Sequence, residues 1–125
     1  RDRQERERAA QLERERDLRE RLAAEERAAA LRAGPEALAW ASVIAAHIQR
    51  QWFRPPSAQP GLRCVIIVDQ IPGGVVTSAR IADCNGDAVV RQSIEAAVMR
   101  ASPLPPPPDP ALFERRLEIV FAPVD

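Results

Sequence analysis

The feature that most constrains the fold is a proline-rich stretch that leads into an alternating segment near the end of the chain. Residues 102–108 read Ser-Pro-Leu-Pro-Pro-Pro-Pro, which favours a stiff, extended conformation. The segment that follows alternates apolar and polar positions with the period of a strand: Arg115, Arg116, Leu117, Glu118, Ile119, Val120 and Phe121. A strand delivered last, after a rigid spacer, is a natural sheet edge, whose unpaired N–H and C=O groups can accept another chain's strand.

Composition excludes two classes of partner. The 125 residues carry 18 basic and 18 acidic side chains, so the net charge is +0. Nucleic acids and acidic membranes favour proteins with a basic excess, and neither is expected as the main partner. No apolar run approaches the ~20 residues that a membrane helix needs. The chain starts at Arg1 without Met, and we expect it to be part of a longer protein.

Residues 1–33 predict a long, charged helix. Nearly all of them are Arg, Glu, Ala, Leu or Gln, which are strong helix formers. An acid precedes a base by four positions at Glu15/Arg19 and at Asp17/Arg21, which stabilises a helix further. The leucines are too sparse for a convincing coiled-coil seam. We expect a solvated single helix or the end of a coiled coil, which would serve as a rod or spacer.

Residues 36–125 predict a small domain. Gly34-Pro35 should end the first helix and open a second one. Apolar side chains then recur every fourth residue and form a stripe that should cover a sheet: Trp40, Ile44, Ile48 and Trp52. The runs 63–70 and 75–83 read as two strands joined by the turn Pro72-Gly-Gly74, and therefore as an antiparallel hairpin.

The remaining elements complete an α+β fold. Asp87 can cap a helix from about residue 88 to 101, and Asp109-Pro110 can start one short turn before the last strand. We therefore expect a small three-stranded antiparallel sheet covered by helices, in the order helix-strand-strand-helix-strand, preceded by a long N-terminal helix. If the first strand is central, the last strand lies on an open edge.

Cys64 and Cys84 flank the predicted hairpin. A turn centred on Gly73 would place Cys64 opposite Ala82, whereas a turn centred on Gly74 or a bulge near Asp83 would bring the cysteines together. A bridge between them would close a loop of about 20 residues and add roughly 3 kcal/mol in the chain-entropy model. The alternative is two inert buried thiols, and the sequence leaves both open.

No residue pattern predicts catalysis, a metal or a cofactor. His47 is the only histidine and has no signalled partner, so we expect a half-exposed helix residue. The run Asp83–Asp87 begins like a calcium loop, but Ala88 and Ile94 stand where that loop needs Gly and Glu. The serines lack the Gly-x-Ser-x-Gly elbow of hydrolases. We expect a protein that is not an enzyme, with neither a cofactor nor a small-molecule substrate.

Several motifs together resemble the C-terminal domains of TolA and, more distantly, of TonB. The resemblance covers about residues 36–125, and residues 1–33 are similar to the end of the TolA helical stalk. The motifs are Gln51-Trp-Phe-Arg-Pro-Pro-Ser57, Gly61-Leu-Arg-Cys64, Pro72-Gly-Gly-Val75, Ser93-Ile-Glu-Ala-Ala-Val98 and Arg100-Ala-Ser-Pro-Leu-Pro105. Some relatives pair a cysteine at the position of Cys64 with one near Arg91, which this chain lacks, so that disulfide cannot be carried over.

The resemblance implies a periplasmic component of the Tol–Pal system of Gram-negative bacteria. Its parent protein would be anchored in the inner membrane by a segment absent from this chain. The implied partners are TolB, through an extended N-terminal segment, and Pal, with colicins and filamentous phage coat proteins as parasitic ligands. In the family the last strand pairs with partner strands, which here corresponds to residues 115–121.

Three hypotheses follow. The first is capture of a TolB segment by strand addition at residues 115–121. The second is a TonB-type domain that grips an outer-membrane transporter, although TonB spacers are typically Pro-rich and residues 1–33 are not. The third is a structural cap for the stalk, which dimerises by pairing the last strand with its own copy.

Overall fold

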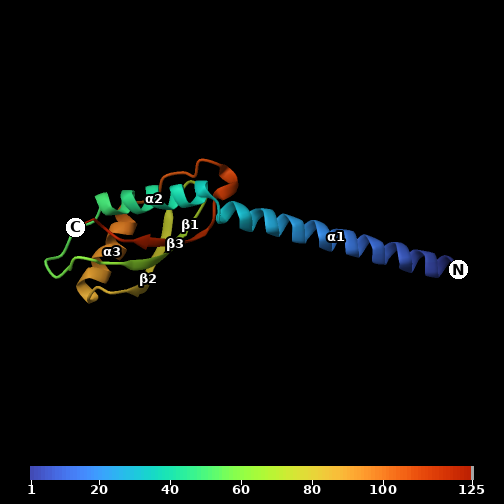
Figure 1. Ribbon diagram of the computed structural model, residues 1–125, viewed down its shortest axis with the longest axis horizontal. Coiled ribbons are helices and arrows are strands. Elements are labelled where there is room, and N and C mark those ends of the chain that lie inside the picture. The colour runs from blue at the N-terminus through green and yellow to red at the C-terminus, as the bar shows by residue number, and fades with distance from the viewer. Residues whose placement is uncertain (125) are drawn as a thin grey trace. The chain divides into compact units, whose positions relative to one another are not determined.

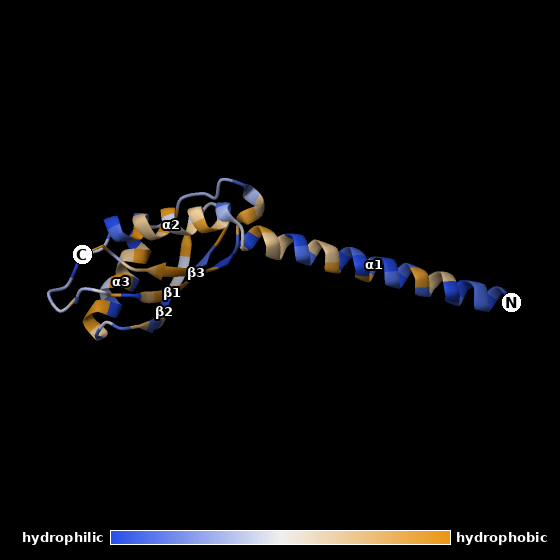
Figure 2. Ribbon diagram, in the orientation of Figure 1, coloured by the Kyte–Doolittle hydropathy of each residue, from blue (hydrophilic) through white to orange (hydrophobic). Residues whose placement is uncertain are grey.

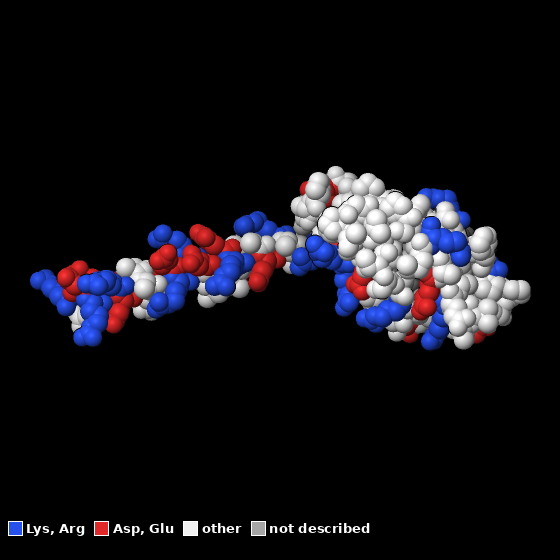
Figure 3. All heavy atoms as spheres, turned by 180° about the vertical axis from the view of Figure 1, so that it is seen from behind, with Lys and Arg blue, Asp and Glu red and all other residues white. Residues whose placement is uncertain are grey.

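The computed structural model describes residues 1–124, which divide into two compact units at the boundary between Gly34 and Pro35 (Figure 1). The first unit is the helix α1 (Asp2–Arg32), as its composition predicts. None of its residues is buried, and Figure 2 shows it mostly hydrophilic. Basic and acidic side chains alternate along it (Figure 3), and the predicted pair Glu15/Arg19 forms an ion pair of 3.9 Å.

The second unit is the predicted α+β fold. Its sheet is antiparallel throughout and has the strand order β2-β1-β3, so the first strand is central and the last lies at an edge, as expected. Its helices and strands are α2 (Pro35–Arg50), β1 (Cys64–Gln70), β2 (Val76–Cys84), α3 (Ala88–Arg100), the 3-10 turn η1 (Pro110–Leu112) and β3 (Arg116–Phe121).

One face of the sheet is buried under the two helices. In β1 and β3 every second residue is buried, and helix α2 packs against β3 while α3 packs against β2 (Figure 1). Burying one large aliphatic or aromatic side chain contributes about 1.5–3 kcal/mol to the stability of the fold. The core combines the predicted stripe of α2 with residues of α3 and the strands: Trp40, Ile44, Ile48, Ile66, Val68, Val90, Ile94, Leu117, Ile119 and Phe121.

Polar groups end the elements where the sequence predicts. The Asp87 carboxylate accepts a 2.8 Å hydrogen bond from the backbone N–H of Val90 and so caps α3. Asp109 does the same for η1 by accepting from the N–H of Ala111. His47 is half-buried, and its Nε2–H donates to the carbonyl of Ala101 at 2.8 Å, which gives it a structural role between α2 and the end of α3.

A disulfide joins Cys64 and Cys84, and a bulge makes it possible. Ile66 pairs with Ile81, but Val65 pairs with Asp83, so Ala82 is the extra residue in β2. The shift places Cys64 directly opposite Cys84, which is the bulge alternative that the sequence left open. Both cysteines are buried on the face under the helices, so the bridge reinforces the end of the core farthest from the hairpin turn.

Candidate docking edge

The outer side of β3 carries backbone groups that no strand of residues 1–124 pairs with. The N–H of Gln70 donates to the carbonyl of Arg115 at 2.8 Å. This bond determines which residues of β3 point their backbone N–H and C=O groups toward β1. Because the backbone groups of successive strand residues point to opposite sides, those of Leu117, Ile119 and Phe121 also bond to β1. The residues between them point their N–H and C=O groups away from the sheet: Arg116, Glu118 and Val120.

No second strand covers these outward groups within residues 1–124, because β3 is paired with β1 alone. Arg116, Glu118 and Val120 are all exposed. The pairing of β3 with β1 runs without a register shift from one end of the strand to the other. The edge is therefore a regular template of alternating donors and acceptors, which is the geometry that an added strand requires.

The opposite edge, formed by β2, is less suited to strand addition. Its pairing with β1 shifts register at two places, and such irregularities twist an edge away from a flat partner. The backbone N–H of Ile81, which points outward, donates instead to the Glu95 carboxylate on α3 at 3.3 Å. A partner strand would have to compete with that side chain, so the free edge of β3 is the better receptor.

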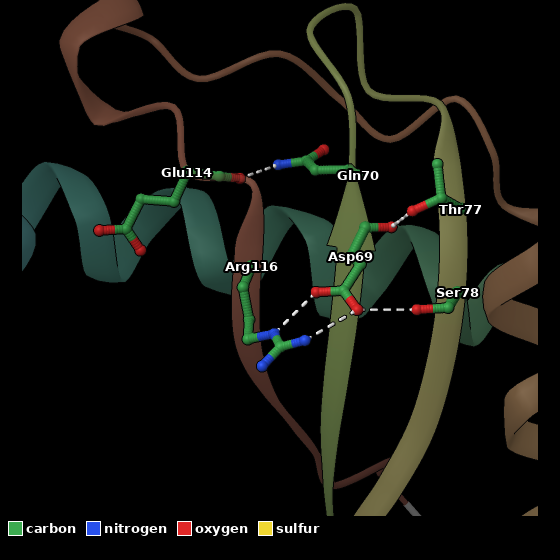
Figure 4. Close-up of polar contacts among 6 residues, drawn as sticks. All are labelled: Asp69, Gln70, Thr77, Ser78, Glu114 and Arg116. Carbon is green, nitrogen blue, oxygen red and sulfur yellow. Dashed lines mark hydrogen bonds and ion pairs between the residues drawn. The ribbon is translucent and has the colours of Figure 1, made fainter.

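Polar contacts hold the start of β3 in place (Figure 4). The Arg116 guanidinium donates from Nε to Asp69 Oδ1 at 2.8 Å and from a terminal nitrogen to Oδ2 at 3.2 Å. Ser78 on β2 donates to the same carboxylate at 2.8 Å, so Asp69 links all three strands. The side-chain amide of Gln70, which is buried, donates to the carbonyl of Glu114 at 2.8 Å.

Aromatic packing holds the other end of β3. Phe121 is fully buried, and the Trp52 ring meets it edge-on with 5.1 Å between ring centroids. Trp52 is itself fixed by a 2.8 Å hydrogen bond from its Nε1 to the hydroxyl of Ser93 on α3. Because β3 is held at both ends, a partner strand would meet an ordered edge and little conformational entropy would be lost on the receptor side.

The contacts at Asp69 change its acidity. Hydrogen bonds from Arg116 and then from Ser78 hold the pKa of the Asp69 carboxyl below its ordinary value of 3.8. The same hydrogen bond raises the pKa of Arg116. Both groups therefore stay charged near neutral pH, and the pair is a permanent feature of the sheet's open face.

Two surface hollows of the second unit offer little for acid–base chemistry. One, of about 230 Å³, is lined by Trp40, Phe113, Gln70, the turn glycines and residues 103–107, none of which is ionisable. Another, of about 340 Å³, contains Asp87, which is already engaged as the cap of α3. No group of His, Cys, Asp or Glu side chains in the described part of the chain could hold a metal ion.

Comparison with known proteins agrees with this geometry. The family described as the TonB C terminal matches residues 38–121. The chain belongs to this TonB C-terminal family. The chain is also 31% identical over 83 residues to the Tol-Pal system protein TolA of Pseudomonas aeruginosa, and this match covers 62% of this chain and 24% of that protein. The chain thus spans about a quarter of the length of its TolA relative.

Two solved structures are also similar to this chain. A solution structure of TolAIII bound to a peptide derived from the N-terminus of TolB matches with a TM-score of 0.60 and 29% identity, covering 68% of this chain and 73% of that one. The C-terminal domain of Helicobacter pylori TonB matches with a TM-score of 0.49 and 16% identity over 66% of this chain and 90% of that one. The resemblance to TolA and TonB C-terminal domains, read from the sequence motifs, is confirmed.

Sequence reasoning predicted the position of β3 but missed the residues that prepare it. Asp69 and Gln70 close an apolar run, and the polar pair at that end of β1 was a readable signal that the strand meets something charged there. Glu95, which protects the β2 edge, gave no such signal because it lies among ordinary helix residues. In residues 1–124 no helix combines the length and the apolar character needed to cross a bilayer.

Proposed function

We propose that residues 36–125 form a protein-binding domain that captures an extended N-terminal segment of TolB by strand addition to β3. The observation that carries the proposal is the ordered, regular edge whose outward groups at Arg116, Glu118 and Val120 have no strand partner within the described chain. A TolB peptide is the ligand in the solved relative that is 29% identical, which supports TolB as the partner class.

The cellular setting is part of the same proposal. The domain would work in the periplasm, at the end of a charged helical stalk, within a protein anchored in the inner membrane. The Cys64–Cys84 disulfide supports an oxidising compartment such as the periplasm. Engagement of TolB would link the inner membrane to Pal at the outer membrane, and colicins or filamentous phage coat proteins would exploit the same edge.

The decisive variant is Glu118→Pro. Proline removes the outward N–H of residue 118 and places a ring where the partner strand must lie, but it leaves the N–H groups that bond to β1 in place. We expect binding of the TolB N-terminal peptide, measured by isothermal titration calorimetry, to fall below detection while the circular dichroism spectrum stays that of a folded domain.

Two control variants separate the backbone effect from other changes. Glu118→Ala keeps the N–H and should bind within a few-fold of the parent chain. Ala79→Pro places proline at an outward position of β2, because Ala79 lies between two residues that bond to β1, and it should leave peptide affinity unchanged. If Glu118→Pro binds as tightly as Ala79→Pro, strand addition at β3 is wrong.

A further inference from the structure

The open face of the sheet carries two charged residues on β3, Arg116 and Glu118, and only Arg116 lies directly opposite a counter-ion on β1. Across β3, β1 and β2, Arg116 lies beside Asp69 and Ser78, and Val120 lies beside Val65. Between these two sets of neighbours, Glu118 on β3 lies beside Ile67 on β1, and Arg80 on β2 lies on the other side of Ile67. Adjacent strands are about 4.8 Å apart, so Arg80 is roughly two strand spacings from Glu118.

Glu118 therefore differs from its neighbour Arg116. The Arg116 guanidinium is engaged by the Asp69 carboxylate through two hydrogen bonds. Glu118 is exposed, and in the described chain it has no opposite charge directly across the sheet, because Ile67 occupies that position. The acidic side chain is thus presented to whatever strand comes to lie on the outer side of β3.

A strand added there would bring one residue directly opposite Glu118, with Cβ atoms about 4.5–5.5 Å apart. Opposite charges stabilise such a pair and like charges destabilise it. The symmetric pairing of two copies of β3 that uses all the outward residues would place Glu118 against Glu118 of the second copy. Charge complementarity therefore favours a partner of different sequence over a second copy of this chain.

We propose that the β3 edge selects an extended peptide with a basic residue opposite Glu118 and an apolar residue two positions away, opposite Val120. In an antiparallel partner the apolar residue comes first along the peptide, and in a parallel partner the basic residue comes first. The residue opposite Arg116 is left unspecified, because that cation already has its counter-ion. This selection rests on the proposed capture of TolB, whose specificity it would determine.

The test is a scan of charges along the TolB N-terminal peptide. Each position is replaced in turn by Lys and by Glu, and the dissociation constants are measured with the parent chain at low salt. We expect one position at which Lys binds about tenfold more tightly than Glu, which corresponds to about 1.4 kcal/mol. The preference should shrink as sodium chloride is raised, because both groups are exposed.

Charge reversal in the domain identifies the contact. With Glu118→Lys the preference at that one peptide position should invert, and with Glu118→Ala it should vanish. Asp83→Lys is the matched control, since it places the same new cation on β2, at the opposite edge of the sheet. That variant should change the affinities of all peptides by a similar factor and should invert the charge preference at no peptide position.

The two proposals fail in different ways. If the peptides bind but no position inverts with Glu118→Lys, or if Asp83→Lys inverts the same position, the charge selection is wrong while strand capture stands. If the parent peptide does not bind, or binds equally to Glu118→Pro, strand capture is wrong and the selection falls with it.

Discussion

Asp69 shows how one side chain can organise an edge strand. Its carboxylate accepts from Arg116 on β3 and from Ser78 on β2, and its backbone carbonyl accepts from the Thr77 hydroxyl at 3.2 Å (Figure 4). Because β3 meets the sheet only through β1, a contact of this kind fixes the position of its first residue. The pair is solvent-exposed, so we assign it a role in register rather than a large share of stability.

The first residue-scale prediction concerns the acidity of Asp69. Arg116→Gln removes the largest cause of its lowered pKa, so the pKa should rise toward 3.8, measured by NMR titration of the side-chain carboxyl. A carboxyl whose pKa is lower in the folded state stabilises the fold above its unfolded pKa and loses that effect as the pH falls through its folded pKa. The parent chain should therefore lose more stability than Arg116→Gln as the pH drops below about 4. Identical titration curves would contradict the contact.

At the scale of elements, the hairpin turn depends on a close approach between segments far apart in the chain. Gly74 has a φ of +86°, and a Cβ there would lie 2.5 Å from the carbonyl oxygen of Leu104. The two backbones are also joined by a 2.8 Å hydrogen bond from the N–H of Leu104 to the Gly74 carbonyl. The turn thus anchors the proline segment that leads to β3.

This contact gives a matched pair of variants. Gly73 has a φ of +98°, but nothing lies within 4 Å of a Cβ built on it. Both Gly73→Ala and Gly74→Ala pay for a left-handed conformation, roughly 1–2 kcal/mol. Only Gly74→Ala must also displace Leu104, so its urea midpoint should fall further, by an additional free energy of about 1–3 kcal/mol. Equal losses of stability in the two variants would show that the fold does not depend on the close approach of Gly74 to Leu104.

The elements also show what a sequence of this kind reveals. Apolar periodicity predicted the helices and strands because burial on one face imposes it, and the turn residues placed most of their ends to within a residue or two. The exception is α2, which ends at Arg50, so Trp52, the last residue of the predicted stripe, lies outside the helix. The bulge at Ala82 was only one of two alternatives, since an extra residue leaves no mark on composition. The hydrogen bond from the N–H of Ile81 to the Glu95 carboxylate could not be predicted, because it depends on how α3 lies against β2.

At the scale of the whole molecule, the chain joins a helix without a core to a domain that has one. No residue of α1 is buried, whereas α2, which follows it directly, contributes Trp40, Ile44 and Ile48 to the core. The stability of the second unit should therefore come from residues after Gly34. This division supports the proposed boundary between a stalk at residues 1–33 and a binding domain at 36–125.

The last prediction tests that boundary by truncation. A chain that starts at residue 34 should keep the melting temperature of the full chain to within a few degrees, because α1 has no buried residue and the deletion therefore removes no part of a core. A chain that starts at residue 42 is the control. It loses Trp40, which is buried and donates from Nε1 to the carbonyl of Pro105 at 3.0 Å. Loss of a buried Trp costs about 3–5 kcal/mol, so this chain should melt far lower or fail to fold.

The truncated domain should also bind the TolB peptide as the full chain does, since the β3 edge is built entirely from residues after Gly34. Calorimetry on the two chains side by side measures this directly. A large drop in melting temperature for the chain that starts at residue 34 would place part of the domain's stability in α1. A drop in affinity at unchanged melting temperature would instead make the stalk part of the binding surface, and the role of rod or spacer would be wrong.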